Sequence, residues 1–322
     1  MVILGVPIAL LAACVLALGA QLQNRGVSAV DEGEDGESRS GFSLRQLGAL
    51  ARTPKWLGGT SLLTLAIALQ LVSLALAPLA VVQPLGALSL VVTAFLDRWM
   101  NKAHIGRAAF QAIALCVVGV TVFVTTAAFT TTSSPSSPGE IIAVLGILAA
   151  VLVLFGVLFA VLRHRRSSLV FALGAGVLFG FVATLAKIVL GRIGALLGGS
   201  VLAPQDWLTL LCIAGLAGAG AFGLYLVQTA YAAGSPDLVV AALTVIDPLI
   251  AVTIGITVLG EARGAPPWVF PVFVVAEAVA VAGVLRLARH APEPQREEQE
   301  AQRTQPVDRP GRIEPRGGTE SG

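Results

Sequence analysis

Two carboxylic acids lie inside long apolar stretches of this sequence, where a charge is costly unless it serves a function. Asp247 stands in the stretch 236–260 and is followed directly by Pro248, and Glu277 stands in the stretch 267–287. At 1.5 Å per residue, each acid lies about 15 Å along its helix, close to the middle of a bilayer. An acid at that depth indicates a binding or coupling site, although a carboxyl that bonds a neighbouring helix also explains each one. We predict that both bind a substrate or a coupling ion.

Three glutamines could bond a solute without bringing a charge into the membrane. Gln70 and Gln228 each stand eight residues before a proline, and Gln83 directly precedes Pro84 as Asp247 precedes its own proline. Amides also join neighbouring transmembrane helices, with about 0.6–2 kcal/mol each, and this alternative stays open. We predict that Gln70 and Gln228 line one central cavity with the two acids, and that Gln83 contributes to binding as the counterpart of Asp247.

Four charged residues near the ends of apolar segments are candidates for a gate or an ion pair: Lys187, Glu261, Asp97 and Arg25. Lys187 stands apart from most other basic residues, so it could hold an anionic group or pair with Glu261. Asp97 and Glu261 are explained equally well by solvation or by a salt bridge. For Arg25, the favoured interpretation is that its long side chain reaches from the helix end to the membrane interface.

The prolines and terminal acids belong to a motif that occurs twice. Pro84 and Asp97 bracket PLGALSLVVTAFLD, and Pro248 and Glu261 bracket PLIAVTIGITVLGE, with the proline 13 residues before the acid in both copies. Each proline predicts a helix kink, because it leaves a carbonyl one turn earlier without its backbone partner. The shared spacing therefore predicts a duplicated unit.

Composition places the chain in the membrane class. It is 56% hydrophobic and 12% charged, with a mean hydropathy of +0.84, and a soluble domain of this size could not cover so much apolar surface. About 20 apolar residues are needed to cross a bilayer. We predict an all-α integral membrane protein with nine transmembrane helices, at about 2–22, 56–76, 78–97, 108–129, 141–162, 169–190, 207–231, 236–260 and 267–287.

The duplicated unit predicts an inverted repeat. Four helices belong to each copy (helices 1–4 and 6–9) and a central helix joins them, so matching helices cross the membrane in opposite directions. This is the architecture of secondary transporters, which bind near the midplane. The predicted parts are a first repeat with a disordered acidic loop at about 31–40, a linking helix, a second repeat and a disordered cytoplasmic tail, at 1–129, 130–166, 167–290 and 291–322.

Basic residues predict the orientation. All 21 except Lys187, Arg192 and Arg263 fall on one side of the predicted bundle. The positive-inside rule then predicts an N-terminus outside and a C-terminus in the cytoplasm. We expect a multi-pass protein of the plasma membrane. The first segment has no basic residue before its apolar run, which favours a retained helix over a cleaved signal peptide.

Several kinds of site are missing from the sequence. It has no phosphate-binding loop, no nucleotide motif, no metal-spaced His or Cys cluster and no Ser/His/Asp grouping. We therefore predict that the protein is not an enzyme, needs no cofactor and binds no nucleic acid, while metal binding stays unknown. Its expected partners are a small-molecule solute or cation and the lipid bilayer, with homodimerisation left open. The GxxxG pair Gly176 and Gly180 favours close helix packing.

Several segments are similar to those of one superfamily of membrane transporters. The segment DPLIAVTIGITVLGE, from Asp247 to Glu261, is similar to the proline-to-glutamate helix of EamA-type repeats, and a helix with a late glycine, Gly283, follows it. The chain thus resembles the drug/metabolite transporter (DMT) superfamily. The nine-helix layout, the long first loop and ALAPLAVVQPLGALS, from Ala75 to Ser89 with WLGG before it, resemble the NIPA-like magnesium transporter branch.

The resemblance implies transport but leaves the substrate open. The NIPA-like pattern has an acid in the second helix shortly before the position of Gln70, where this chain has SLLTLAIAL without an acid. A magnesium site needs several oxygen ligands, including carboxylates, and Asp247 with Glu277 is a small set. We therefore expect first a proton-coupled or exchanging carrier of a small metabolite. A transporter of magnesium or another divalent cation comes second, and a non-transporting membrane scaffold third.

Overall fold

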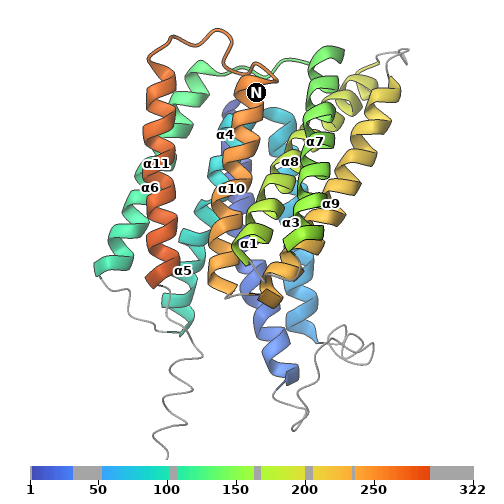
Figure 1. The fold of residues 1–322 in the computed structure, drawn as a ribbon. Helices are drawn as coiled ribbons and strands as arrows, with labels where there is room; N and C mark the ends of the chain where they lie inside the picture. The colour runs from blue at the N-terminus through green and yellow to red at the C-terminus, as the bar shows by residue number, and fades with distance from the viewer. Residues whose placement is uncertain are drawn as a thin grey trace, which may run out of the picture. The chain divides into compact units, whose positions relative to one another are not determined.

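The computed structural model describes residues 2–31, 53–101, 107–162, 168–199, 206–233 and 236–290, all within one compact unit, Met1–His290. Every regular element in these ranges is a helix (Figure 1). The predicted acidic loop, apart from its first residue, and the predicted tail lie outside the described residues. The helices are α1 (Val2–Asp31), α3 (Pro54–Leu76), α4 (Leu79–Gly86), α5 (Leu88–Asn101), α6 (Arg107–Thr130), α7 (Pro138–Leu162), α8 (Ser168–Leu197), α9 (Trp207–Ala233), α10 (Pro236–Thr257) and α11 (Val269–His290).

Nine stretches of the described chain are long and apolar enough to cross a membrane. Eight are single helices, and α4 with α5 makes the ninth, from Leu79 to Leu96. The predicted all-α fold with nine membrane-spanning helices is confirmed. The inverted relation between the first four and the last four helices stays a prediction.

The third span begins and breaks at prolines. Ala77 is the C-cap of α3 and Pro78 is the N-cap of α4, so the two helices follow each other without a loop. The span is interrupted at Ala87, three residues after Pro84. The matching helix α10 runs without interruption through Pro248, so a kink there stays a prediction. This part of the chain thus contributes a separate short helix, α4, whose start needs partners from elsewhere.

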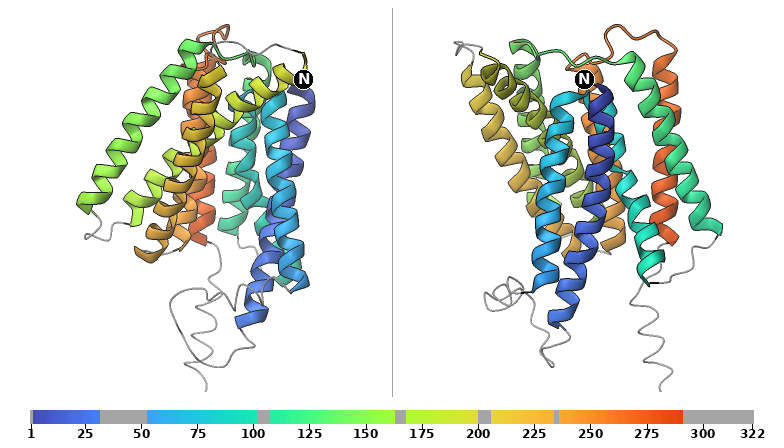
Figure 2. Two further views of the ribbon diagram at one scale, coloured as in Figure 1. Left: turned by 90° about the vertical axis from the view of Figure 1, so that its right-hand side faces the viewer. Right: turned by 180° about the vertical axis from the view of Figure 1, so that it is seen from behind.

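Small residues hold several helix pairs close together. A Cβ atom placed on Gly59 of α3 would lie 2.5 Å from the backbone nitrogen of Gln23 in α1. One on Gly119 of α6 would lie 2.5 Å from the backbone nitrogen of Ala280 in α11. Backbones without side chains between them can approach in this way. Figure 2 shows α6 and α11 side by side, and α1 beside α3.

Helix α8 lies deepest in the bundle. It contacts α3, α7, α9 and α10, and most of its residues are buried, whereas few residues of α7 are. Its two GxxxG glycines pack on α10: a Cβ on Gly180 would lie 2.7 Å from the Cβ of Ile250. The helix therefore places Lys187, two turns further on, inside the bundle.

Candidate functional site

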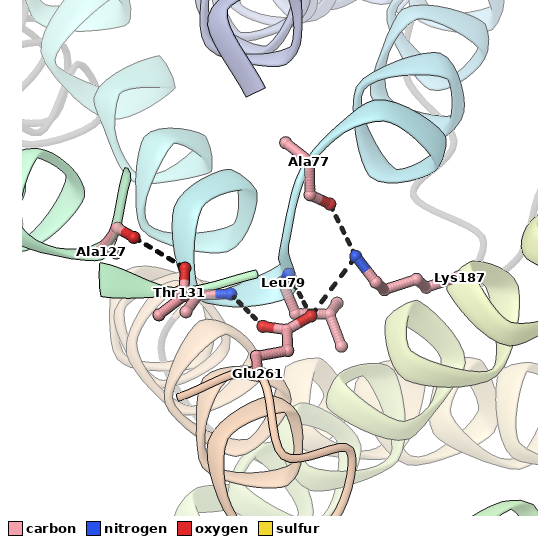
Figure 3. Close-up of polar contacts among 7 residues, drawn as sticks. Ala77, Leu79, Ala127, Thr131, Lys187 and Glu261 are labelled. Atoms are coloured by element: carbon pink, nitrogen blue, oxygen red, sulfur yellow. Dashed lines mark hydrogen bonds and ion pairs between the residues drawn. The ribbon is translucent and has the colours of Figure 1, made fainter. Parts of the chain in front are cut away.

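Glu261 is a buried carboxylate that accepts hydrogen bonds from the start of another helix. It follows α10 in the chain and is only 3% exposed. Its Oε1 accepts from the backbone N–H of Leu79 at 2.8 Å, and its Oε2 from that of Ala80 at 3.0 Å (Figure 3). The first N–H groups of a helix have no partner within the helix. The carboxylate supplies one, and its charge lies at the positive end of the α4 dipole.

Helix α8 brings a cation to the same carboxylate. Nζ of Lys187 lies 3.3 Å from Oε1 of Glu261 and donates to the carbonyl oxygen of Ala77 at 2.6 Å (Figure 3). A buried ion pair is tolerated when hydrogen bonds satisfy the rest of each charged group. Here both charges also bond the backbone around the α3–α4 break. The structure therefore contains the ion pair that the sequence left open.

Backbone hydrogen bonds hold Glu261 in place. The N–H of Thr132, just after α6, donates to the carbonyl of Glu261 at 2.8 Å, and the N–H of Glu261 donates to the carbonyl of Gly255 at 2.9 Å. A Cβ on Gly255 would lie 2.9 Å from Oε2 of Glu261, so only glycine leaves room for the carboxylate. The ion pair and the three residues whose backbone groups it bonds are called the buried ion-pair cluster: Ala77, Leu79, Ala80, Lys187 and Glu261.

A hollow of about 350 Å³, lined by both apolar and polar residues, lies beside the cluster. It is lined by residues of α3, α7, α8, α9 and the segments before α7 and α9, among them Lys187, Ser134, Arg192 and Asp206. Ser134 is exposed, so the hollow reaches the surface. Two nitrogens of Arg192 bond the carboxylate of Asp206, at 2.5 and 2.7 Å, in the fork-shaped geometry of strong Arg–carboxylate pairs. We call this hollow the vestibule.

Asp247 lies where α10 crosses α8. Its Oδ1 atom is buried and has no hydrogen-bond partner within the described part of the chain. A Cβ on Gly180 would lie 3.0 Å from the carbonyl oxygen of Asp247, and one on Gly176 would lie 3.5 Å from its backbone nitrogen. Buried polar atoms without partners are rare, and each one calls for an explanation such as a bound ion or a functional role.

Glu277 lines a small pocket between the two repeated prolines. Pro84, Pro248 and Thr244 line the same pocket, whose volume is about 10 Å³, close to the space of one water molecule. Asp247 does not line it. The structure therefore places Glu277 beside the proline pair and does not bring both acids into this pocket.

The three glutamines lie in different surroundings. Gln83 is buried in α4, Gln70 is half-buried in α3, and Gln228 is exposed on α9. None of them lines the vestibule or the pocket at Glu277. The structure therefore does not gather Gln70 and Gln228 around these hollows with the acids, and Gln83 is the most enclosed of the three.

The last two predicted site residues cannot be placed by their side chains. Arg25 is in α1 and Asp97 is in α5, but their side chains lie outside what the structure describes. Their roles as gate or ion-pair residues stay predictions.

Comparison with known protein families identifies the family of this chain. The family described as magnesium transporter NIPA matches residues 1–217, more than half of the chain. The protein belongs to the NIPA magnesium transporter family. An uncharacterized protein of Corynebacterium glutamicum is also similar, with 28% identity over 289 residues, which cover 89% of this chain and 95% of that protein. No solved structure matches.

Membership of the NIPA family confirms the resemblance to the DMT superfamily, to which this family belongs. It also makes the chain a multi-pass membrane protein of a transporter family. The matched region ends within α9. It therefore includes Lys187 but stops before Asp247, Glu261 and Glu277, so the second half of the site is known from this chain's own structure.

The acids of this NIPA-family chain do not form a closed metal cage. Within the described ranges, no three His, Cys, Asp or Glu residues lie close enough together to hold a metal ion. Magnesium does not require such a cage, because it keeps several waters and binds through one or two carboxylates.

Sequence reasoning missed the backbone partners of the buried ion-pair cluster. The N–H groups of Leu79 and Ala80 and the carbonyl of Ala77 belong to no residue type that marks a site. Pro78 was the available signal, since a proline that starts a helix implies N–H groups in need of an acceptor. The pair between Arg192 and Asp206 was missed as well, because nothing in the sequence connects two residues at separate helix ends.

Proposed function

We propose that this protein transports Mg²⁺ or another divalent cation across the membrane. The observation that carries the proposal is the match to the magnesium transporter NIPA family over residues 1–217. This order reverses the expectation from the sequence, which put a metabolite first because the chain has few membrane-embedded acids. A hydrated Mg²⁺ ion removes that objection, since it needs only one or two carboxylates.

Asp247 is the residue that we propose to contact the cation. Its Oδ1 is buried and without a partner in the described residues, which leaves an oxygen ready for a cation or a proton. The glycines of α8 bring a second backbone close to it, at Gly176 and Gly180. We propose Glu277 as a second carboxylate on the path and the amide oxygen of Gln83 as a neutral ligand.

A proton-coupled or exchanging carrier of a small metabolite is the second candidate. One observation favours it: the vestibule, at about 350 Å³, has the size of small-molecule sites. In this case Asp247 would carry the coupling proton.

Magnesium flux into liposomes tests the first proposal. Purified protein is reconstituted in liposomes that contain a Mg²⁺-sensitive dye, and the initial rate of uptake is measured. We expect Asp247→Asn to lower this rate at least tenfold, because an amide cannot supply the negative charge. The matched control is Glu140→Gln, which removes an acid that pairs with Arg263 near the surface and should leave the rate unchanged.

The outcomes separate the candidates. If the wild-type protein moves no divalent cation, but a proton gradient drives uptake of a solute selected by its thermal stabilisation of the protein, the metabolite carrier is supported. If neither flux is seen across a broad panel of ions and solutes, both transport proposals are wrong and the non-transporting scaffold is left.

We also propose that the protein lies in the plasma membrane with its N-terminus outside and its C-terminus in the cytoplasm. The distribution of basic residues supports this orientation. The start of α1 and the end of α11 lie at opposite ends of the bundle (Figures 1 and 2), as an odd number of membrane crossings requires.

A further inference from the structure

We infer that the buried ion-pair cluster is a latch that closes the vestibule from Asp247 and opens whenever a solute passes. The inference rests on the proposed transport function, of which it identifies one moving part. It gives Lys187 and Glu261 a positioning role: they hold α4, α8 and the segment after α10 together in the closed state.

The cluster joins the parts that would have to separate. Glu261 bonds the start of α4 through two N–H groups, at 2.8 and 3.0 Å, and Lys187 of α8 pairs with it at 3.3 Å. Lys187 also bonds the carbonyl of Ala77 at 2.6 Å. The α3–α4 break, α8 and the α10–α11 connection therefore meet at two side chains, and moving any one of them breaks a bond to these residues.

The cluster also lies between the vestibule and Asp247. Lys187 lines the vestibule, and seven residues earlier on α8, about 10 Å along the helix axis, Gly180 packs on the backbone of Asp247. Thr184, between these two positions, is fully buried. A solute that enters the vestibule therefore reaches the ion pair before it reaches the level of Asp247.

An ion pair suits a contact that must open and close. Removing two paired charges from water costs about as much as their attraction returns, so the pair adds little net stability. The adjacent vestibule reaches the surface through exposed Ser134, so water can reach both charges when they separate. Tight packing of large apolar side chains would resist opening more strongly, because separation would expose their surface to water.

Thiol accessibility at Thr184 tests the latch without any transport assay. The parent protein carries Cys14→Ser, since Cys14 is exposed while Cys116 and Cys212 are buried. Thr184→Cys is then added as a reporter. A membrane-impermeant methanethiosulfonate reagent is applied from the side that labels Ser134→Cys, which identifies the vestibule side. We expect the labelling rate of the reporter to rise at least tenfold when Glu261→Gln or Lys187→Met is introduced.

Two controls make the result specific. Glu140→Gln breaks the ion pair between Glu140 and Arg263 and should leave the reporter rate unchanged. Cys212 is fully buried in α9. Its labelling rate is measured in the parent without the reporter, with and without each latch substitution, and should not change. Unchanged reporter rates in both latch variants overturn the inference. So does an equal rise at Cys212, which would mean that the whole bundle has loosened.

The charge-swapped protein, Lys187→Glu with Glu261→Lys, provides the sharpest comparison. A lysine at position 261 cannot accept from the N–H groups of Leu79 and Ala80, so the swap should be labelled as fast as the single variants. A return to the wild-type labelling rate would show that only the attraction between the two charges matters, and would overturn the role given to the N–H groups of α4. Because labelling needs no substrate, absence of Mg²⁺ flux alone would defeat the proposed function but not this structural result.

Discussion

Glu261 illustrates how much a single residue's role depends on backbone groups. The repeated spacing of proline and acid drew attention to Glu261, and its opposite charge suggested Lys187 as a partner. The sequence could not predict that the same carboxylate caps α4, because the groups it bonds are main-chain N–H groups. Nor could it predict that Gly255 makes room for the carboxylate, since this contact depends on how the chain turns after α10.

We expect Gly255→Ala to destabilise the protein by about 1–3 kcal/mol, the usual cost of overfilling a packed site. The added Cβ would lie 2.9 Å from Oε2 of Glu261 and 3.1 Å from the Cβ of Leu79. The melting temperature in detergent measures the effect. The matched control is Gly146→Ala in α7, where no atom lies within 4 Å of the added methyl; its melting temperature should not fall.

At the scale of helices, the sequence pattern predicted where the membrane-spanning helices lie better than it predicted whether each helix is continuous. Length and apolar composition located all nine spans, because a bilayer imposes both on any crossing helix. Two equivalent prolines nevertheless have different outcomes: the helix breaks at Ala87 after Pro84, while α10 continues through Pro248. Neighbouring helices can compensate for the lost hydrogen bond in one place and not in the other, and that context is absent from a single sequence.

We expect Gly283→Ala to be more harmful than the change at Gly255. A Cβ on Gly283 would overlap the backbone nitrogen of Cys116 and lie 2.8 Å from the carbonyl oxygen of Ala112. Backbone cannot rotate aside as a side chain can, so α11 and α6 would have to move apart. Folded yield and melting temperature should both decrease. Gly156→Ala in α7, an open position, serves as the control, and equal behaviour of the two variants would contradict the close α6–α11 contact.

At the scale of the whole molecule, the contacts between helices agree with the arrangement expected of an inverted repeat without proving it. Helix α1 contacts α3 and α5, and α8, its expected counterpart, contacts α9 and α10. The pairs α6–α11 and α4–α10 each join one helix to its own counterpart. The predicted common cavity has less support, because a helix can expose an amide such as Gln228 on a face that spacing alone does not identify.

The orientation prediction concerns segments beyond the described residues. Single cysteines are introduced in the 31–40 loop and in the tail, and intact cells are treated with a membrane-impermeant thiol reagent. Neither position should react, because both are expected in the cytoplasm, whereas Ser134→Cys should react from outside. Labelling of the loop or the tail in intact cells would show that the chain is inserted the other way round.

Helix α7 has a consequence for how the protein is made. It is strongly apolar, carries its only acid in the first turn, and has few neighbours, which lie in α8 and α9. A segment of this kind can leave the insertion machinery and enter lipid without waiting for a partner. During synthesis it would anchor the growing chain after the first four spans and reverse the direction of everything that follows. An unrelated apolar helix of the same length should therefore support biogenesis in its place, whereas its deletion should leave the last four helices inserted upside down.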